Sequence, residues 1–378
     1  MKLLHLADLH IGKKVYEYSM LEEQKEVLNQ AISMAVNQKV DVVLIAGDIY
    51  DKSVPTIEGV KLLDSFLTAL SKENIRVFLI SGNHDSAERL SFGRELLETS
   101  GVYVSGILKE QIEKITLLDR YGEVNFYLLP FIKPQQIQVV EGEELPNNNT
   151  EAIRLLLNRV SIDNTKRNVI LAHQFVGGMG IELLETDSEI KSIGGLDIVE
   201  YQVFDDFDYV ALGHLHKSQY VGRETVRYAG SPIKYSFSEA RHTKSATLVT
   251  MQEKGTITIE KLRFHPLHDM REMKGTLEQL TKEEVLKEVD KEDYVHITLT
   301  DEEEIYDVLG KLRAVYPNLM LLDFDNKRTR ATGVLQITEE VKKQQGTLEL
   351  FQEFFLKQTG SMMEEIQEKM VRDMLEDV

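Results

Sequence analysis

The chain has 378 residues, of which 42% are hydrophobic and 28% are charged, a composition typical of globular proteins long enough for two domains. The absence of cysteine excludes a disulfide framework, a zinc–thiolate site and a cysteine nucleophile, and it fits a reducing cytoplasm. The formal net charge of −19 argues against a free-standing nucleic-acid binder, because such proteins normally carry a basic face. No apolar run reaches about 18 residues and Met1 to Leu4 leads directly into a strand, so we expect neither a signal peptide nor a membrane anchor.

The chain up to residue 264 predicts an α/β fold. A strand at Lys2 to Leu6, a helix at Leu21 to Asn37 and a strand at Val42 to Ile45 predict a right-handed, parallel β-α-β unit. A second helix at Ile57 to Leu70 precedes a third strand at Arg76 to Ile80. The other expected elements are strands at Val102 to Val104, Ile112 to Leu118, Val124 to Pro130, Asn168 to Ala172, Asp208 to Leu212, Ala246 to Met251 and Thr256 to Phe264, and a helix at Glu151 to Val160.

Five of the strands end in Asp, His or Asn side chains. These sets are Asp8 with His10, Asp48 with Asp51, Asn83 with His84, His173 alone, and His214 with His216. Any one set has an ordinary explanation as a turn or a helix N-cap, because Asp and Asn favour both. Their ordered recurrence indicates a site, since open α/β sheets keep their ligands at the carboxyl ends of the strands.

The donor types in these sets indicate a paired metal site. They contain five of the ten histidines of the chain, together with carboxylate and amide oxygens and no thiolate. Such donors suit Mn²⁺, Fe or Zn²⁺. Seven ligands are too many for one ion, but they fit two ions roughly 3.5–4 Å apart that share a bridging carboxylate. The chemistry of such a site is in-line hydrolysis of a phosphate ester.

The order of the motifs, Asp-x-His, Gly-Asp-x-x-Asp, Gly-Asn-His-Asp, a lone His and Gly-His-x-His, resembles that of the calcineurin-like metallophosphoesterases. Longer stretches are similar to SbcD, a family of bacterial nuclease subunits related to the double-strand-break repair nucleases of archaea and eukaryotes. These stretches are LHLADLHIGK, LISGNHDS, LAHQFVGG, DYVALGHLHKSQ and YAGSPIKYSFSE. The resemblance covers most of residues 1–264 and continues more loosely to the end. It implies two mixed β-sheets flanked by helices.

The resemblance also implies a role for each site residue. Asp8, His10 and His216 would hold one metal ion, and Asn83, His173 and His214 the second. Asp48 would bridge the two ions, for which Mn²⁺ is the expected metal. His84 would stabilise the transition state or protonate the leaving 3′ oxygen, and Asp51 would orient His84.

Three parts of the chain are expected by the same resemblance. Residues 1–264 would form the nuclease domain, residues 265–340 a small α+β capping domain that selects DNA geometry, and residues 341–378 a helical tail. The pattern in the capping domain predicts helices at Leu277 to Val289 and Glu302 to Val315, and strands at Tyr294 to Leu299, Leu319 to Phe324 and Gly333 to Ile337. The apolar stripes of the tail fit packing on the capping domain, or docking on a partner.

The implied function is that of a DNA nuclease, 3′–5′ exonuclease on duplex ends and endonuclease on single strands and hairpins, in DNA repair, recombination and replication. The implied partner is an SbcC-like ABC-type ATPase with a long coiled coil. We expect a homodimer within a heterotetramer, in the cytoplasm at the nucleoid and without a membrane. The helices at Ile57 to Leu70 and Leu90 to Leu97 fit a homodimer interface or the core of one chain.

Two alternative functions remain open at this point. One is a metallophosphatase or phosphodiesterase that acts on small phosphate esters with the same metals, and the capping domain and the tail argue against it. The other is a catalytically inactive scaffold that binds DNA ends. The complete ligand set argues against the scaffold.

Overall fold

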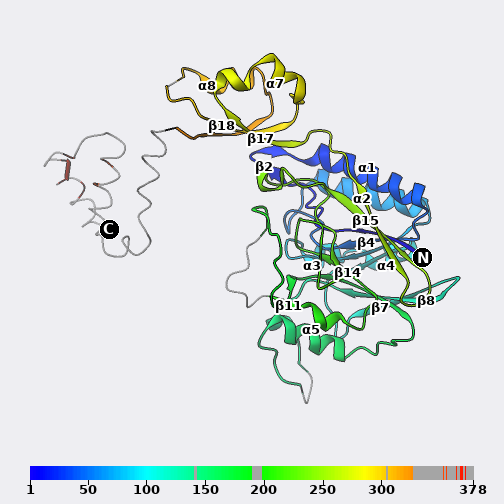
Figure 1. The fold of residues 1–378 in the computed structure, drawn as a ribbon. Coiled ribbons are helices and arrows are strands. Elements are labelled where there is room, and N and C mark those ends of the chain that lie inside the picture. The colour runs from blue at the N-terminus through cyan, green and yellow to red at the C-terminus, as the bar shows by residue number, and fades with distance from the viewer. Residues whose placement is uncertain are drawn as a thin grey trace.

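The computed structural model describes residues 1–139, 143–189, 198–303 and 305–326, and the single residues 352, 355, 363, 367, 368 and 371. Two six-stranded sheets lie face to face, and a small three-stranded sheet lies beside them next to α1 (Figure 1). The predicted strand at Gly333 to Ile337 lies outside the described residues, as does the tail apart from those single residues. Among the described residues, no helix has the length and apolarity needed to cross a membrane.

The first sheet confirms the predicted β-α-β opening. Its strand order is β16-β15-β1-β4-β5-β6, in which β1, β4, β5 and β6 are parallel and β15 and β16 are antiparallel. The central strands are rich in Val, Leu and Ile and are buried, as expected of strands covered on both faces. The bounds are β1 Lys2–Leu6, β4 Val42–Ala46, β5 Arg76–Ile80, β6 Val102–Ser105, β15 Ser245–Met251 and β16 Ile257–Arg263.

The second sheet contains the predicted strands of the middle of the chain. Its order is β13-β14-β12-β9-β8-β7, with β14, β12, β9 and β8 parallel and the two edge strands antiparallel. Val124, Phe126 and Leu128 of β8 face the first sheet and pack in the core between the two sheets. The bounds are β7 Glu113–Asp119, β8 Gly122–Leu129, β9 Arg167–His173, β12 Tyr209–Gly213, β13 Gln219–Val221 and β14 Arg223–Tyr228. Short two-residue strands are β2 Lys14–Val15, β3 Tyr18–Ser19, β10 Val176–Gly177 and β11 Val199–Glu200.

Helices cover the outer faces of both large sheets (Figure 1). The apolar side of α1 (Leu21–Gln38) and of α2 (Ile57–Lys72) packs on the first sheet, as their periodicity predicts. The helix α5 (Asn149–Asn158) packs on the second sheet through Ile153 and Leu156. Two short helices, α3 (Ala87–Leu90) and α4 (Arg94–Thr99), follow β5.

The small sheet has its own hydrophobic core and is entirely parallel, in the order β17 (Met270–Gly275), β18 (Tyr294–Leu299) and β19 (Leu319–Phe324). The single helix predicted at Leu277 to Val289 is wrong, because the chain breaks into α6 (Leu277–Leu280) and α7 (Glu283–Glu288) at Thr281 and Lys282. The helix predicted from Glu302 begins later, as α8 (Val308–Arg313). Its start is fixed by Asp307, which has a left-handed backbone and accepts a hydrogen bond from Gly310.

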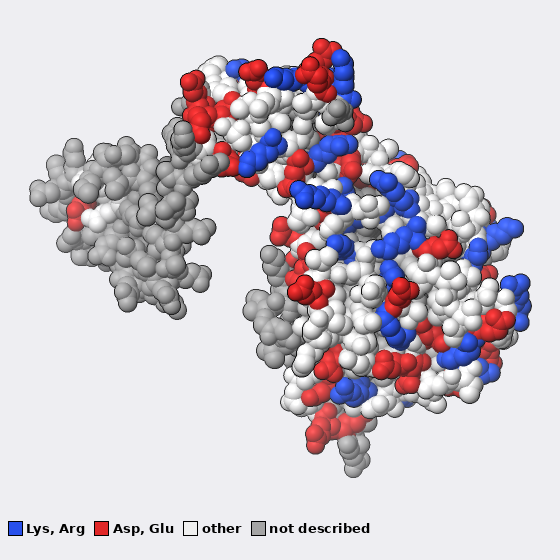
Figure 2. Space-filling model, in the orientation of Figure 1, with Lys and Arg blue, Asp and Glu red and all other residues white. Residues whose placement is uncertain are grey.

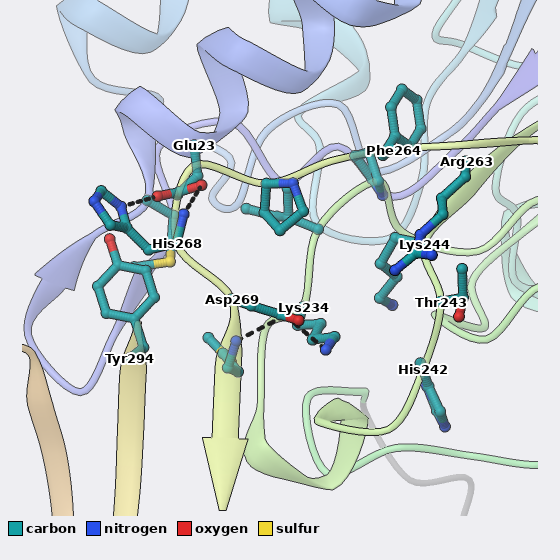
Figure 3. A pocket seen from close by; sticks show the side chains of 15 residues that line it. Glu23, Lys234, His242, Thr243, Lys244, Arg263, Phe264, His268, Asp269 and Tyr294 are labelled. Carbon is teal, nitrogen blue, oxygen red and sulfur yellow. Dashed lines mark hydrogen bonds and ion pairs between the residues drawn. The ribbon is translucent and has the colours of Figure 1, made fainter. Parts of the chain in front are cut away.

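The small sheet is joined to the first large sheet by polar contacts with α1 (Figure 3). The buried carboxylate of Glu23 accepts the backbone N–H of Leu267 at 2.9 Å and lies 2.6 Å from Nδ1 of His268. Lys234 reaches Asp269 at 2.7 Å on the other side of the same pocket. Burial, together with the Glu23 carboxylate, raises the pKa of Tyr294 to about 12, so its hydroxyl stays protonated at this junction.

Candidate metal centre

The five strands whose polar ends were singled out in the sequence all end at one place. Three of them, β1, β4 and β5, are neighbours in the first sheet, and β9 and β12 are neighbours in the second. The two sheets approach unusually closely here. A Cβ atom on Gly213 would lie 1.9 Å from the carbonyl oxygen of Ala46, and one on Gly47 would lie 2.3 Å from His173. Only glycine at these positions lets side chains from both sheets share one site.

The backbone is strained at several of the expected ligands. Asp8, His10 and Asp48 have φ angles of 54°, 42° and 49°, and His214 has a φ of 103°. L-amino acids avoid the left-handed region, at a cost of roughly 1–2 kcal/mol per residue. Such strain gathers at functional sites, where the surrounding fold enforces it. The fold thus gives up some stability to aim these four side chains inward.

Asp8, His10 and His216 form the first group of ligand atoms. One ligand atom from each residue lies within 4.8 Å of the other two. The Nε2 atoms of His10 and His216 are 3.1 Å apart, so both imidazoles point at the same place. Asp8 is fully buried, and its Oδ2 atom has no hydrogen-bond partner among the described residues. An unpartnered carboxylate oxygen beside two converging imidazoles is the arrangement that a cation would complete.

Asn83, His173 and His214 form the second group. The Oδ1 atom of Asn83 lies 3.0 Å from Nε2 of His173 and 3.2 Å from Nδ1 of His214. The amide oxygen of Asn83 and the two ring nitrogens therefore converge. The backbone N–H of His214 donates to Oδ1 of Asp8 at 2.8 Å, which ties the second group to the first.

Asp48 lies between the two groups. Its Oδ2 atom is 3.4 Å from Nε2 of His173 and 3.6 Å from Nε2 of His10. Asp48 accordingly belongs to two of the three groups of potential ligands that the structure brings together, the one with Asp8 and His173 and the one with His10 and His84. This is the position that a bridging carboxylate requires.

Burial dominates the electrostatics of the site. It lowers the pKa of His10, lowers that of His214 to about 3, and raises that of Asp8 to about 7. Burial alone would also lower the pKa of His173 and raise that of Asp48, but their mutual attraction reverses both shifts and raises the pKa of His173 to about 9. Neutral imidazoles and a carboxylate that lacks a partner are ligands in the form that metals bind. The seven side chains therefore fit two divalent ions that share Asp48.

His84 lies at the edge of the metal-ligand set. Its side chain is 22% exposed, and its Nε2 atom is 3.9 Å from Oδ2 of Asp48. Its Nδ1 atom lies 3.0 Å from the backbone carbonyl oxygen of Asp51, which fixes the direction of the ring. The Asp51 carboxylate instead pairs with Lys13 at 2.8 Å. The contact with His84 thus belongs to the main chain of Asp51, and the aspartate side chain is not what this contact requires.

Several supporting residues carry no signal that the sequence reveals. Behind His216, the Ser188 hydroxyl lies 2.7 Å from Nδ1 of His216 and donates to Oε1 of Glu239 at 2.6 Å. Glu239 in turn pairs with the buried Lys244, which also donates to the carbonyl oxygen of His216. This chain of contacts holds the ring of His216 and selects the nitrogen that faces the site. Ser188 and Glu239 are separated from His216 by 28 and 23 residues, so spacing alone could not link them.

Asp85 braces the loop after β4 from a neighbouring strand end. Its carboxylate accepts backbone N–H groups from Ile49 at 3.1 Å, Tyr50 at 2.9 Å and Gly82 at 2.9 Å. Burial raises the pKa of Asp85 to about 6, with the Asp48 charge acting in the same direction. Asp85 therefore shapes the loop that carries Asp48 and does not join the ligand set.

Comparison with known proteins fits this geometry. The family model described as calcineurin-like phosphoesterase matches residues 1–218, more than half of the chain. The chain belongs to the calcineurin-like phosphoesterases. A second model, described as type 5 capsule protein repressor C-terminal domain, matches residues 266–359, which include the small sheet. Calcineurin-like phosphoesterases are hydrolases of phosphate esters that use divalent metal ions, in agreement with the ligand groups found here.

Two curated relatives extend the likeness within calcineurin-like phosphoesterases. The chain is 30% identical to the SbcD subunit of the nuclease SbcCD from Staphylococcus epidermidis, over 99% of this chain and 98% of the relative. It is 32% identical to the protein of the same name from Staphylococcus saprophyticus, over 85% and 84% of the two chains. The chain is therefore a member of the SbcD family, as the sequence motifs indicated. Among solved structures, a dimetal phosphatase from Danio rerio has 13% identity and a TM-score of 0.41, over 70% of this chain and 96% of that one.

Replacing the shared carboxylate should reduce the number of ions bound. We expect Asp48→Ala to lower the Mn²⁺ stoichiometry from two to one or fewer in isothermal titration calorimetry, because both groups lose a ligand. Asp51→Ala is the matched control, since the carboxylate of Asp51 faces Lys13. Two ions bound at unchanged affinity in Asp48→Ala would contradict the bridging position.

Removing the hydroxyl behind His216 should weaken metal binding. We expect Ser188→Ala to raise the dissociation constant for Mn²⁺ about 10-fold or more, the usual effect of losing a group that orients a metal-binding histidine. Ser188→Thr keeps a hydroxyl and should restore most of the affinity. Ser238→Ala is the control, because Ser238 contacts the same loop through Asp187 without reaching His216. Equal affinities of wild type and Ser188→Ala would show that Ser188 does not position the ring.

Proposed function

We propose that this chain is the metal-dependent DNA nuclease subunit of an SbcCD complex and hydrolyses phosphodiester bonds. The observation that carries the proposal is that one chain combines the convergent ligand set around Asp48 with an end-to-end match to nuclease subunits. A phosphatase acting on small esters would need the metal site alone. The match to SbcD-family relatives extends through the small sheet and beyond it, which favours a polymeric substrate.

The metal-site residues divide the chemistry between them. Two divalent ions, held by Asp8, His10 and His216 and by Asn83, His173 and His214 with Asp48 shared, would stabilise the negative charge that develops on the phosphate. Manganese suits this mixture of oxygen and imidazole donors. The metal identity and these individual ligand roles are part of the proposal.

His84 is the proposed general acid. Its Nδ1 atom is occupied by the Asp51 carbonyl oxygen, so the Nε2–H faces the ligand groups. When a water oxygen attacks phosphorus, the bond from phosphorus to the 3′ oxygen breaks, and Nε2 of His84 supplies the proton that this leaving oxygen needs. The attacking water gives up its proton to solvent. Partial exposure of His84 lets it regain a proton after each cycle.

The small sheet is the proposed selector of DNA geometry. We divide the chain into a nuclease domain at residues 1–264, a capping domain at residues 265–340 and a tail at residues 341–378 that docks on the ATPase partner. The contacts of Glu23 with Leu267 and His268 hold the start of the capping domain against α1. A rigid cap beside the site would admit ends, hairpins and single strands differently, which supports exonuclease action on duplex ends and endonuclease action on the other two.

The proposed assembly is a homodimer bound to two copies of an SbcC-like ATPase in the cytoplasm, at the nucleoid. The printed name of the relatives describes one component of a two-component nuclease. Phe92 and Leu96, beside and within α4, are 87% and 76% exposed, which supports an apolar dimer contact at this place. The ATPase would supply many of the phosphate contacts that an acidic chain lacks.

Cleavage should depend on His84 more than metal binding does. With Mn²⁺, we expect wild type to cleave a hairpin-ended duplex and single-stranded DNA. His84→Gln should lower kcat about 10²–10⁴-fold, the usual contribution of general acid catalysis. The variant should still bind two ions by calorimetry. Retained cleavage in His84→Gln would remove its assigned role, and a wild type that hydrolyses only a small chromogenic phosphodiester would overturn the nuclease proposal.

Loosening the junction should change substrate choice and not the chemistry. We expect Glu23→Ala to lower the ratio of hairpin cleavage to single-strand cleavage, and to speed proteolysis near residue 265, because the partners of a buried carboxylate are left unsatisfied. Hydrolysis of a small phosphodiester should stay within about twofold. Glu22→Ala is the matched control, since Glu22 is exposed on the same helix. An unchanged ratio together with faster proteolysis would contradict a role of the cap in selection.

A further inference from the structure

The face that each large sheet turns toward the other changes from apolar to polar at one edge. In β15, Val249 and Met251 belong to the core between the sheets, and Thr247 and Ser245 continue the same face. In β1, Leu3 belongs to that core and His5 follows it on the same face. Since His5 is paired with Thr247 in register, and Thr247 with Lys261 of β16, these three side chains form one row across the first sheet.

The buried members of this edge lack partners. His5, Thr247 and Ser245 are buried, yet Nε2 of His5, Oγ1 of Thr247 and Oγ of Ser245 have no hydrogen-bond partner among the described residues. The hydroxyl of Ser218, in the loop after His216, also lacks one. Each of these groups can donate a hydrogen bond. Leaving a buried donor without a partner costs about 1–3 kcal/mol, so four neighbouring cases call for an acceptor.

Arg227 faces this row from the second sheet. It is paired in register with Ala211, which belongs to the core between the sheets, so both point toward the first sheet. Its side chain is 7% exposed and lies over the ring of Tyr220. Arg227 lowers the pKa of His5, although burial contributes more. His5 in turn lies 2.9 Å from the hydroxyl of Tyr209, which bridges the two sheets at this point.

Two lysines complete a cationic cluster. Nζ of Lys261 donates to the backbone oxygen of Ser218 at 3.2 Å, next to Lys217. Burial lowers the pKa of Lys261, and the charges of Arg227 and Lys217 lower it further. Within the described ranges, no Asp or Glu forms an ion pair with Lys217, Arg227 or Lys261. Water would satisfy the hydroxyls, but it would not compensate three gathered positive charges.

The cluster lies beside the metal centre. Lys217 directly follows the ligand His216, and Lys261 holds the loop that both belong to. On the face shown in Figure 2, Lys and Arg side chains gather in a column below the small sheet, over the part of the molecule where Figure 1 labels β15. On a chain of net charge −19, such a concentration of cations is a local exception.

We propose that Lys217, Arg227 and Lys261, with the hydroxyls of Thr247, Ser245 and Ser218 behind them, bind a phosphate of the DNA backbone beside the cleaved bond. This inference rests on the proposed function. The donors and cations match an oxyanion, which accepts several hydrogen bonds and carries the compensating charge. The exposed ring of Tyr220 next to Arg227 offers a stacking surface for a base of the same strand.

The test removes the charges one at a time in the full-length chain with Mn²⁺. For Lys261→Gln and Lys217→Gln, we expect KM for a hairpin-ended duplex to rise about 3–10-fold at constant kcat, and the slope of log KM against log salt to fall by about one for each lysine replaced. Thr247→Val should also raise KM and keep the thermal unfolding temperature, because it removes a hydroxyl without changing the volume. Lys72→Gln, on the outer surface of α2, is the matched control.

The outcomes separate this inference from the proposed function. Unchanged KM and salt slope in both lysine variants, in a wild type that cleaves DNA, would overturn the phosphate site and leave the nuclease proposal intact. A wild type without DNA cleavage but with small-ester hydrolysis would overturn the nuclease proposal itself. Inorganic phosphate provides the second arm. Calorimetric binding of phosphate that Lys261→Gln abolishes, with KM for DNA unchanged, would assign the site to free phosphate and overturn its role in DNA binding.

Discussion

The close approach of the two large sheets at their carboxyl ends is the constraint on which the site depends. Gly47 and Gly213 remove the side chains that would otherwise keep β4, β9 and β12 apart, and a Cβ atom on Gly82 would lie 2.1 Å from Oδ1 of Asp48. Asp48 can therefore reach ligands from both sheets. A single sheet could carry the first strand ends, but it could not bring His173 and His214 to the opposite side of the same carboxylate.

The cost of this arrangement appears in the backbone and in the charges. Left-handed conformations at Asp8, His10 and Asp48, and buried ionisable groups with shifted pKa values, each destabilise the folded chain. These costs fall on ligands, while the strands beneath them are fully buried and apolar. The fold is thus regular where it supports the site and strained where the site lies. Bound cations would relieve the electrostatic part of the cost and link metal binding to stability.

The sequence predicts the supporting fold well and the site only in part. Strands such as Val42–Ala46, which end in glycine and polar residues, are recognisable because burial on both faces leaves a continuous apolar run. The convergence of Asn83 with His173 and His214 could be inferred only through a family resemblance, because nothing in their spacing says that two sheets stack. The contact of His84 with the carbonyl of Asp51, and the support of His216 by Ser188, leave no trace in residue type. The break between α6 and α7 was missed because periodicity continues through it.

The uneven distribution of charge gives the two positive features their meaning. A chain of net charge −19 repels a polyanion, but salt screens that repulsion beyond about 8–10 Å. DNA that comes within this distance meets attraction only where cations are concentrated, at the metal centre and at the row of Lys217, Arg227 and Lys261. Two such places beside each other define a direction for the backbone across the protein, whereas one would define only a point. An acidic nuclease subunit arranged in this way would gain orientation from its own surface and would gain most of its affinity from a basic partner.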